Sequence, residues 1–252
     1  MIKIERHNII MREIRSQGSV LVPALAELLQ CSEETVRRDL KELDQAGKLI
    51  RTHGGAYIVE KHDKSFPIDL RKSYIASTKS RMAELAMKYI QDNDVLMLDQ
   101  STTCLSLAEK LISSGRSYTI ITNSLAICEA FNASHSNVEL ICTGGTLRRR
   151  SSSFADPNSL QIIERYHADK AFISCPKVSV QYGLYDNNLS EANVRAKMIQ
   201  HSGQRFLIVD HTKLEGYANV LFEGLEDINV IITDRELPEE WKLYCKKNHV
   251  MM

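Results

Sequence analysis

The sequence predicts an α/β fold in two parts, a small helical unit with a hairpin followed by a larger domain built on a parallel sheet. Apolar residues recur at helical spacing through residues 1–57. From residue 75 onward, short uninterrupted apolar runs alternate with helix-like stretches. The chain has 252 residues, enough for one or two compact domains. We therefore expect a first domain over residues 1–57, a linker over 58–74 and a second domain over 75–252.

Two short helices are predicted at the start of the chain. Ile10 and Ile14 lie one turn apart in the first helix. Pro23 is compatible with the second helix because it occupies the first turn. The second helix has one apolar face at positions i, i+3, i+4 and i+7, formed by Val22, Leu25, Ala26 and Leu29.

A third helix follows a tight break at residues 30–32. Val36, Leu40 and Leu43 fall at i, i+4 and i+7, which predicts an inward stripe. Ser32 is positioned to cap the helix, and Gly47 to end it.

A hairpin completes the first domain. Residues 49–51 and 56–59 read as short strands that flank Gly54 and Gly55. Three short helices followed by a hairpin are typical of a winged helix-turn-helix.

The third helix is predicted to turn a charged face outward. At about 100° per residue, Glu34, Arg38 and Lys41 point away from the apolar stripe. Such residues can read guanine edges and neutralise phosphates, although a plain solvated face is the alternative. His53 has no neighbouring cluster that would make it a metal ligand. The predicted DNA-binding residues, on this helix and the hairpin, are Ser32, Glu34, Thr35, Arg37, Arg38, Lys41, Arg51 and His53.

Six strands are predicted in the second domain. Their uninterrupted apolar runs suit strands that are buried on both faces of a parallel sheet, with helices as crossovers. The runs are residues 95–99, 118–122, 138–142, 170–174, 206–210 and 230–234.

Polar residues follow the first three of these strands. Because the carboxyl ends of parallel strands meet at one edge of a sheet, we expect these residues to lie together. A helix N-terminus with nearby hydroxyls is a ready phosphate site, although Ser and Thr also cap helices for structural reasons alone. The predicted effector-binding residues here are Asp99, Gln100, Ser101, Thr102, Thr103, Asn123, Ser124, Gly144, Gly145 and Arg148.

The charges of the chain balance. There are 32 Lys plus Arg against 32 Asp plus Glu, which excludes a histone-like polycation. Residues 1–57 carry nine basic and eight acidic side chains, so the first domain is only +1 (9 − 8). DNA contact must therefore come from charges gathered on one face, and weak affinity per monomer makes pairing of subunits a requirement.

Several classes of protein are disfavoured. No apolar run approaches the roughly 20 residues that span a bilayer. Charges interrupt the N-terminal stretch, so we expect neither a membrane protein nor a signal peptide. The cysteines are scattered without a CxxC pair, which favours free thiols in a cytoplasmic protein and no metal site or cofactor. These cysteines are Cys31, Cys104, Cys128, Cys142, Cys175 and Cys245.

The residues of the third helix and hairpin carry a family resemblance. The run from Ser32 to Leu40, followed by Leu43, Gly47 and the segment from Arg51 to Ala56, resembles the DeoR family of bacterial transcriptional repressors. The resemblance implies DNA binding through the helix from Ser32 to about Ala46, with Arg37 and Arg38 as the leading contacts. The second domain is similar to the family's sugar-phosphate sensor, whose fold resembles ribose-5-phosphate isomerase and coenzyme A transferases.

Two later segments match the same family. Residues 190–199 include Glu191, and residues 210–213 include Lys213. By this resemblance Lys213 is a candidate for the sugar-phosphate pocket. Glu191 is a pocket or interface residue, with a structural salt bridge as an equal alternative.

The loop after the fourth strand departs from the family pattern. Residues 174–179 contain no acid, whereas isomerases of this fold use carboxylates there to move protons. Replacement from elsewhere in the chain, by Asp186 or Glu191, is not expected. Cys175 has no nearby base, so we expect a buried pocket wall rather than a nucleophile.

These observations predict a non-enzymatic, DNA-binding repressor of a carbohydrate-utilisation operon. Its predicted partners are double-stranded operator DNA and a phosphorylated sugar effector, and it is expected to act as a homo-oligomer, a dimer or tetramer. The resemblance is nearest to the fucose-operon branch. The alternatives are a sugar-phosphate isomerase or CoA-transferase-like enzyme with an appended binding module, and a protein-interaction module.

Overall fold

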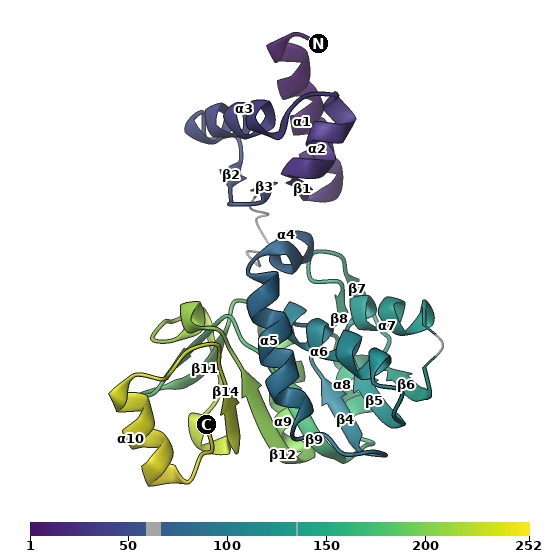
Figure 1. Cartoon of the computed structure of the whole chain (residues 1–252), viewed down its shortest axis with the longest axis vertical. Helices are drawn as coiled ribbons and strands as arrows, with labels where there is room; N and C mark the ends of the chain where they lie inside the picture. Colours follow the sequence, from purple (N-terminus) through teal and green to yellow (C-terminus); the bar gives the residue numbers. More distant parts are fainter. Residues whose placement is uncertain (59–66, 135) are drawn as a thin grey trace. The chain divides into compact units, whose positions relative to one another are not determined.

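The computed structural model of the chain describes residues 1–58, 67–134 and 136–252 (Figure 1). It contains two compact units, an N-terminal unit over Met1–Ala76 and a C-terminal unit over Ser77–Met252. Of the predicted linker, residues 59–66 lie outside the described residues. Residues Ile68–Ser73 form a short helix, α4, within the N-terminal unit. Its buried Ile68 and Leu70 give it an apolar side that the sequence pattern did not reveal.

The three predicted helices and the hairpin of the N-terminal unit are confirmed. The sheet also has a third strand, β1, which pairs antiparallel with β3 and gives the order β1-β3-β2. A three-residue strand is too short to show a period, so it could not be read from the sequence. The elements are α1 (Lys3–Gln17), β1 (Ser19–Leu21), α2 (Val22–Leu29), α3 (Glu33–Gln45), β2 (Ile50–Arg51) and β3 (Gly55–Tyr57).

The core of the N-terminal unit joins the apolar stripes of its helices. Gly55 lies where backbone and side chains approach closely. A Cβ on Gly55 would lie 2.0 Å from the Val20 carbonyl oxygen and 2.8 Å from Cδ2 of Leu70. The buried cluster includes the predicted residues Ile10, Ile14, Val22, Leu25, Leu29, Val36, Leu40 and Leu43.

The C-terminal unit is built on a six-stranded sheet in the order β14-β12-β9-β4-β5-β6. Every neighbouring pair in this sheet is parallel, which confirms the predicted architecture. All six predicted strands are present, as β4 (Val95–Leu98), β5 (Tyr118–Thr122), β6 (Val138–Cys142), β9 (Ala168–Ile173), β12 (Ser202–Ile208) and β14 (Val230–Ile232).

Helices cover both faces of this sheet. On one face, Ile121 and Ile173 pack in a cluster with Val194 of α9. On the other face, Phe172 stacks on Phe206 with ring centroids 4.5 Å apart. The helices are α5 (Ala76–Met87), α6 (Thr102–Ser113), α7 (Leu125–Asn132), α8 (Pro157–Ile163), α9 (Leu189–Gln200) and α10 (Glu239–Asn248).

Several short strands and 3-10 turns lie at the carboxyl edge of the sheet. A three-stranded antiparallel sheet has the order β10-β11-β13, and β7 pairs with β8 in a two-stranded hairpin. These elements bring side chains from distant parts of the chain to the strand ends. They are β7 (Leu147–Arg148), β8 (Ser153–Phe154), β10 (Lys177–Ser179), β11 (Gly183–Asp186) and β13 (Val220–Glu223), with the 3-10 turns η1 (His211–Lys213) and η2 (Leu225–Asp227).

Candidate functional site

Helix α3 begins with the predicted side-chain cap. The Ser32 Oγ accepts a hydrogen bond from the Thr35 backbone N–H at 3.2 Å, and the two hydroxyl oxygens are 2.9 Å apart. Glu33 and Glu34 occupy the first turn, where the helix dipole favours negative charge. The cap fixes where α3 begins after α2, and the buried Val36, Leu40 and Leu43 leave the opposite face outward.

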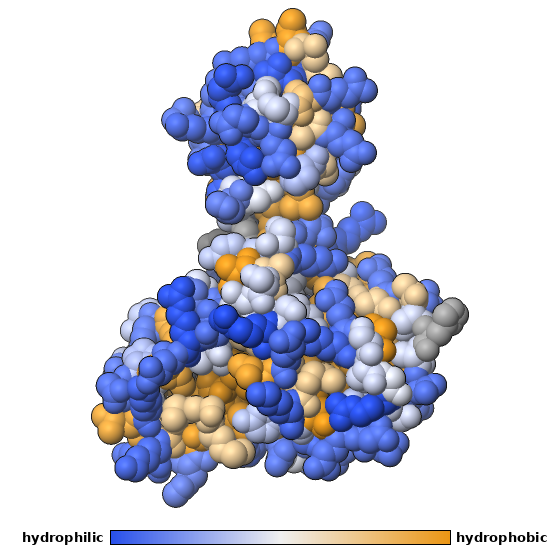
Figure 2. All heavy atoms as spheres, viewed as in Figure 1, coloured by the Kyte–Doolittle hydropathy of each residue, from blue (hydrophilic) through white to orange (hydrophobic). Residues whose placement is uncertain are grey.

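The outward face of α3 carries the predicted charged residues. Glu34, Arg38 and Lys41 are exposed. Arg37 is half-exposed and pairs with Glu33 one turn earlier, with 2.9 Å between Nη2 and Oε2. In Figure 2 the surface over α3 is predominantly hydrophilic. Arg38 and Lys41 are thus the cations of α3 that are best placed to meet an external partner.

Asp39, on the same helix, has an internal role that the sequence did not reveal. Its carboxylate is buried and accepts hydrogen bonds from Arg6 Nε at 2.7 Å and Arg6 Nη2 at 3.1 Å. Burial alone would raise the pKa of Asp39, but the hydrogen bonds and charge of Arg6 lower it below its ordinary value. This pair ties α3 to α1 and holds the angle at which the outward face is presented.

The hairpin places the other predicted DNA-binding residues at the surface. Arg51 and His53 are both exposed. The turn is closed by the Thr52 N–H, which donates to the Gly55 carbonyl at 2.8 Å. The Arg51 N–H donates to Asp44 Oδ1 at 3.3 Å, which links the hairpin to the last turn of α3.

In the C-terminal unit, the predicted effector-binding loops meet at the carboxyl edge of β4, β5 and β6. Ser101 caps α6 by accepting from the Cys104 N–H at 3.0 Å, and Ser124 caps α7 by accepting from the Ile127 N–H at 3.3 Å. Two helix N-termini therefore lie at this edge, with their positive dipole ends beside the loops. The buried predicted residues are Asp99, Gln100, Ser101, Thr102, Thr103, Asn123 and Ser124.

Three buried side chains at these strand ends have polar atoms without a hydrogen-bond partner among the described residues. The atoms are Nε2 and Oε1 of Gln100, Oδ1 of Asn123 and Oγ1 of Thr143. Asn123 uses only its amide nitrogen, which donates to the Phe154 carbonyl at 3.0 Å. An unmet buried polar group costs about 1–3 kcal/mol, so native structures rarely keep several together. These atoms give the edge an unused capacity for hydrogen bonding.

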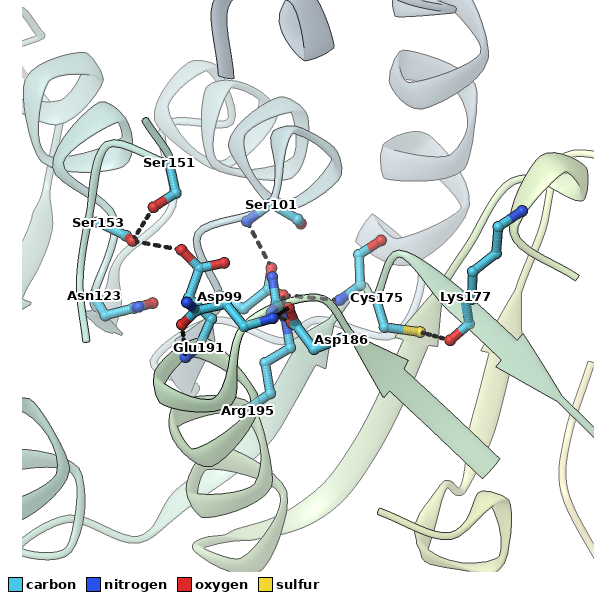
Figure 3. Close-up of polar contacts among 12 residues, drawn as sticks. Asp99, Ser101, Asn123, Ser151, Ser153, Cys175, Lys177, Asp186, Glu191 and Arg195 are labelled. Carbon is cyan, nitrogen blue, oxygen red and sulfur yellow. Dashed lines mark hydrogen bonds and ion pairs between the residues drawn. The ribbon is translucent and has the colours of Figure 1, made fainter. Parts of the chain in front are cut away.

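A buried charge network lies beneath the loops (Figure 3). Arg195 of α9 donates from Nε to Asp99 Oδ2 at 2.7 Å and from Nη1 to Asp186 Oδ2. Asp99 also accepts from the backbone N–H groups of Ser101 at 3.0 Å and Ser174 at 3.1 Å. Asp99 thus faces inward and holds the loops after β4 and β9 in place.

The pKa shifts of this network follow from burial and from the paired charges. Burial alone would lower the pKa of Arg195, but the charges of Asp186 and Asp99 raise it above its ordinary value. Burial raises the pKa of Asp186, and the charge of Arg195 opposes that rise. A guanidinium stays protonated throughout the physiological range, so Arg195 keeps a positive charge beside both buried acids.

The network depends on Arg195, which the sequence analysis missed. A signal was present, because Glu191, Arg195 and Met198 recur at i, i+4 and i+7 on α9. An arginine that shares a buried helical face with an apolar residue needs a carboxylate partner. The partner's identity was not readable, because Asp99 is 96 positions away in the sequence.

Glu191 and Arg148 form a salt bridge at the same edge. Arg148 Nε lies 3.2 Å from Glu191 Oε1, and Ser153 Oγ donates to the same oxygen at 3.4 Å. Glu191 is buried, whereas Arg148 is partly exposed. Of the alternatives for Glu191, the salt bridge is present. Arg148 remains close enough to the edge to meet an anion there, but it is already engaged with a carboxylate.

Cys175 is buried, as predicted. Its thiol donates to the Lys177 carbonyl at 3.2 Å. Burial raises the pKa of Cys175 to about 12, so the thiol stays protonated at neutral pH. Lys213 lies in η1, partly exposed, and its charge acts on Cys175. The structure therefore brings Lys213 to the same edge as the loops after β4 and β9.

The glycines after β6 have conformations that other residues avoid. Gly144 has φ +59° and Gly145 has φ +106°. Asp156 packs against Gly145 and accepts from the Thr146 N–H at 2.8 Å and the Ser159 N–H at 3.0 Å. These hydrogen bonds lower the pKa of Asp156 to about 2. The loop after β6 is thus held by a carboxylate that stays ionised.

The loop at residues 174–179 has no acid, and carboxylates reach this edge from other elements. They are Asp99, Asp186 and Glu191. All three carboxylates are hydrogen-bonded to Arg195 or Arg148, so each is already engaged in an ion pair.

The described part of the chain has no group of three or more His, Cys, Asp or Glu side chains arranged to hold a metal ion. Within the same residues no helix has the length and apolar character needed to cross a bilayer.

Comparison with protein families also divides the chain into two parts. Residues 6–62 match the DeoR-like helix-turn-helix domain, and residues 75–235 match the DeoR C terminal sensor domain.

Whole-length relatives agree with these matches. The HTH-type transcriptional regulator YulB of Bacillus subtilis is 34% identical over 94% of this chain and 91% of its own length. The L-fucose operon activator of Haemophilus influenzae is 31% identical over 98% of both chains.

Among solved structures, ribose 5-phosphate isomerase A from Neisseria gonorrhoeae has a TM-score of 0.37 and 15% identity, over 54% of this chain and 52% of that one.

Proposed function

The chain belongs to the DeoR family of helix-turn-helix transcriptional regulators, and from this premise we propose that it represses a carbohydrate-utilisation operon under the control of a phosphorylated sugar. The sugar binds at the carboxyl edge of β4, β5 and β6, and the α3 face binds operator DNA.

The observation that carries the effector half of this proposal is the set of unpartnered polar atoms at three adjacent strand ends. Gln100, Asn123 and Thr143 follow β4, β5 and β6 in turn, and all three side chains are buried. Amides and hydroxyls are the groups that recognise sugar hydroxyls. The N-terminus of α6, with Thr102 and Thr103 in its first turn, supplies the dipole and backbone N–H groups that a phosphate prefers.

The DNA half rests on the geometry of α3 and the hairpin. Arg38 and Lys41 are exposed on one face of a capped helix, and Arg51 and His53 are exposed on the hairpin that follows it. In a winged helix-turn-helix the third helix enters the major groove, where arginine can bind a guanine edge in bidentate fashion. We propose the full predicted set as the DNA-binding face.

The proposed mechanism is thermodynamic linkage in a homo-oligomer. A ligand that binds one arrangement of the C-terminal units better than another shifts the population of the paired DNA-binding units. Two winged helices on one operator are needed because each N-terminal domain has a charge of only +1 (9 − 8) over residues 1–57. Operator half-sites are therefore expected to repeat or to be palindromic.

The first candidate for the effector is a phosphorylated deoxyhexose. The support is the similarity to a protein of Haemophilus influenzae that is named an L-fucose operon activator. Because that relative is named an activator, an experiment must decide whether this chain represses or activates its operon. In a reporter strain, deletion of the regulator raises operon expression if it represses and lowers expression if it activates.

The proposal includes the absence of catalysis. Proton abstraction from a sugar carbon needs a free base of suitable pKa. The carboxylates of Asp99, Asp186 and Glu191 are instead engaged by Arg195 and Arg148. Turnover of pentose or hexose phosphates by the purified chain, lost in Glu191→Gln, would favour the isomerase alternative.

The test of the effector is a thermal-shift screen of the full chain. Phosphorylated pentoses, hexoses and deoxyhexoses are compared with the same sugars without phosphate. A ligand that binds only the native state stabilises it by about 2.7 kcal/mol at 100 times its Kd. We expect a shift for one phosphorylated sugar and none for its unphosphorylated form. Equal shifts for both forms, or none for any compound, would contradict the proposal.

A further inference from the structure

Two cysteines face each other beside the effector-binding loops. Cys142 is the last residue of β6, and its neighbour Ile141 packs in the cluster that includes α8 and α9 residues. Successive side chains of a strand point to opposite faces, so Cys142 points to the other face of the sheet. Helix α7, which packs on β6, carries Cys128 one turn after its capping residue Ser124. Thr122, the last residue of β5, pairs with Cys142, and α7 begins three residues later at Leu125.

The two thiols interact directly. The Cys128 and Cys142 thiols are each the largest influence on the pKa of the other. The neighbouring Cys128 thiol and the Gly144 backbone lower the pKa of Cys142 to about 6, despite the opposing effect of burial. The proximity of Cys142 and burial raise the pKa of Cys128. Cys142 is exposed and Cys128 is half-buried, so one sulfur is an accessible thiolate with a protonated thiol beside it.

The other four cysteines have different surroundings. Cys104, Cys175 and Cys245 are buried, and Cys31 is half-exposed in the N-terminal unit. Burial of Cys104 raises its pKa well above the ordinary value. A reactive cysteine is an accessible, low-pKa thiolate, and a redox-sensitive one also has a second thiol within reach. Among the described residues only Cys142, with Cys128 beside it, combines these properties.

We propose that Cys128 and Cys142 form a peroxide-oxidised dithiol pair that closes into an intramolecular disulfide between α7 and β6. The Cys142 thiolate attacks one oxygen of hydrogen peroxide, the O–O bond breaks, and hydroxide leaves. The sulfur loses two electrons and becomes a sulfenic acid. The Cys128 sulfur then displaces the sulfenic hydroxyl, which leaves as water with the Cys128 proton. Overall one thiol and one thiolate become a disulfide, and peroxide becomes water and hydroxide.

The disulfide would act on the loop that follows β6. Thr143 comes directly after Cys142, and its N–H donates to the Thr122 carbonyl at 3.0 Å. A covalent link from Cys142 to α7 joins two of the three strand ends that form the candidate effector site. This consequence rests on the proposed function, whereas formation of the disulfide does not.

The test uses the full reduced chain and hydrogen peroxide at neutral pH. Remaining thiols are alkylated, and the protein is digested without reduction and analysed by mass spectrometry. We expect loss of two thiols, a peptide pair linked through Cys128 and Cys142, and a monomer band on a non-reducing gel. In Cys128→Ser, a dimedone adduct should accumulate on Cys142 and not on the buried Cys104, because peroxide and dimedone reach only an accessible sulfur.

Matched variants separate the outcomes. Cys142→Ser should lose the linked peptide, and Cys31→Ser should keep it. The proposal is overturned if wild type retains all six thiols, if Cys142 goes to sulfinic acid without a link, or if the link joins two chains. Effector affinity is then compared in the reduced and oxidised chains. If the two affinities are equal, the disulfide does not act on the effector-binding loop. If neither form binds a phosphorylated sugar, the proposed function is refuted, but the disulfide result still stands.

Discussion

The Nε of Arg195 lies 2.7 Å from Oδ2 of Asp99, although the two residues are 96 positions apart and both side chains are almost fully buried. This contact joins α9 to the loop after β4, and the same guanidinium holds Asp186 at the end of β11. The floor of the candidate effector site is therefore one ionic unit, and its members depend on one another.

Removal of the cation should destabilise the C-terminal unit strongly. Arg195→Met leaves Asp99 and Asp186 buried without a counter-charge, and we expect a loss of about 3–5 kcal/mol. Lys197→Met on the same helix is the control, because it removes a partly exposed pair with Glu164 and should cost at most about 1 kcal/mol. Urea unfolding of the full chain measures both. Equal losses for the two variants would show that Arg195 has no special role.

The loop after β6 should not tolerate a side chain at Gly145. Its φ is +106°, and a Cβ would lie 2.3 Å from Asp156 Oδ1. Gly145→Ala is expected to lower stability by about 1–3 kcal/mol and to weaken effector binding. Gly115→Ala is matched, because Gly115 has φ +69° but nothing within 4 Å of a Cβ. It should cost only about 1–2 kcal/mol of backbone strain and leave effector affinity unchanged.

Asp156 should give the C-terminal unit a defined acid sensitivity. Its pKa is lowered from 3.8 to about 2, so its carboxylate stabilises the fold above the unfolded value and loses this effect as pH falls toward 2. Asp156→Ala should cost about 1 kcal/mol at pH 7, as for other N-cap residues. The difference between wild type and variant, measured by urea unfolding, should narrow between pH 4 and pH 2. A gap that stays constant over this range would contradict the assignment.

Negative charge at the start of α6 should abolish the effector response. Thr102 is buried in the first turn of the helix, where the proposed phosphate lies. Thr102→Asp places a carboxylate in that position and should remove the thermal shift caused by the phosphorylated sugar. Ser113→Asp, at the other end of the same helix, is the control and should keep the shift. Unchanged ligand affinity in Thr102→Asp would remove this loop from the site.

Operator binding should depend on the outward face of α3. Arg38→Ala is expected to cost about 1–3 kcal/mol if the arginine reads a base, and the loss should be largest at one operator position. If Arg38 instead meets a phosphate, affinity falls evenly across sequences and the salt slope decreases by about one. Arg12→Ala, on the exposed side of α1, is the control. No change in Arg38→Ala would refute the assigned face.

The sequence predicted the helices and strands whose own residues show a regular pattern of apolar positions. The stripe of Val36, Leu40 and Leu43 and the six apolar strand runs appear as buried elements in the structure. The capping role of Ser32 was also readable, because it depends only on residues three positions away. Local pattern was therefore sufficient for the architecture of both units.

The contacts that shape the candidate site could not be read in the same way. Asp39 was counted as one more helix charge, but Arg6 buries it against α1. The short strands β1, β10 and β11 have too few residues to show alternation. Asp186 reaches the sheet edge only because β11 pairs with β10 and β13. Such contacts depend on tertiary packing between distant segments, which one sequence does not encode locally.

In the proposed function, one chain couples the binding of a phosphorylated sugar to the binding of operator DNA. The most direct measurement is a gel-shift titration of the full chain on the DNA upstream of its own gene, at moderate salt, with and without the sugar phosphate selected by thermal shift. We predict a sequence-preferring complex whose apparent Kd changes about 5- to 150-fold when the ligand is added, and which does not respond to the unphosphorylated sugar. A sequence-preferring complex with the same Kd in all three conditions, or no preference over unrelated DNA, would contradict the account.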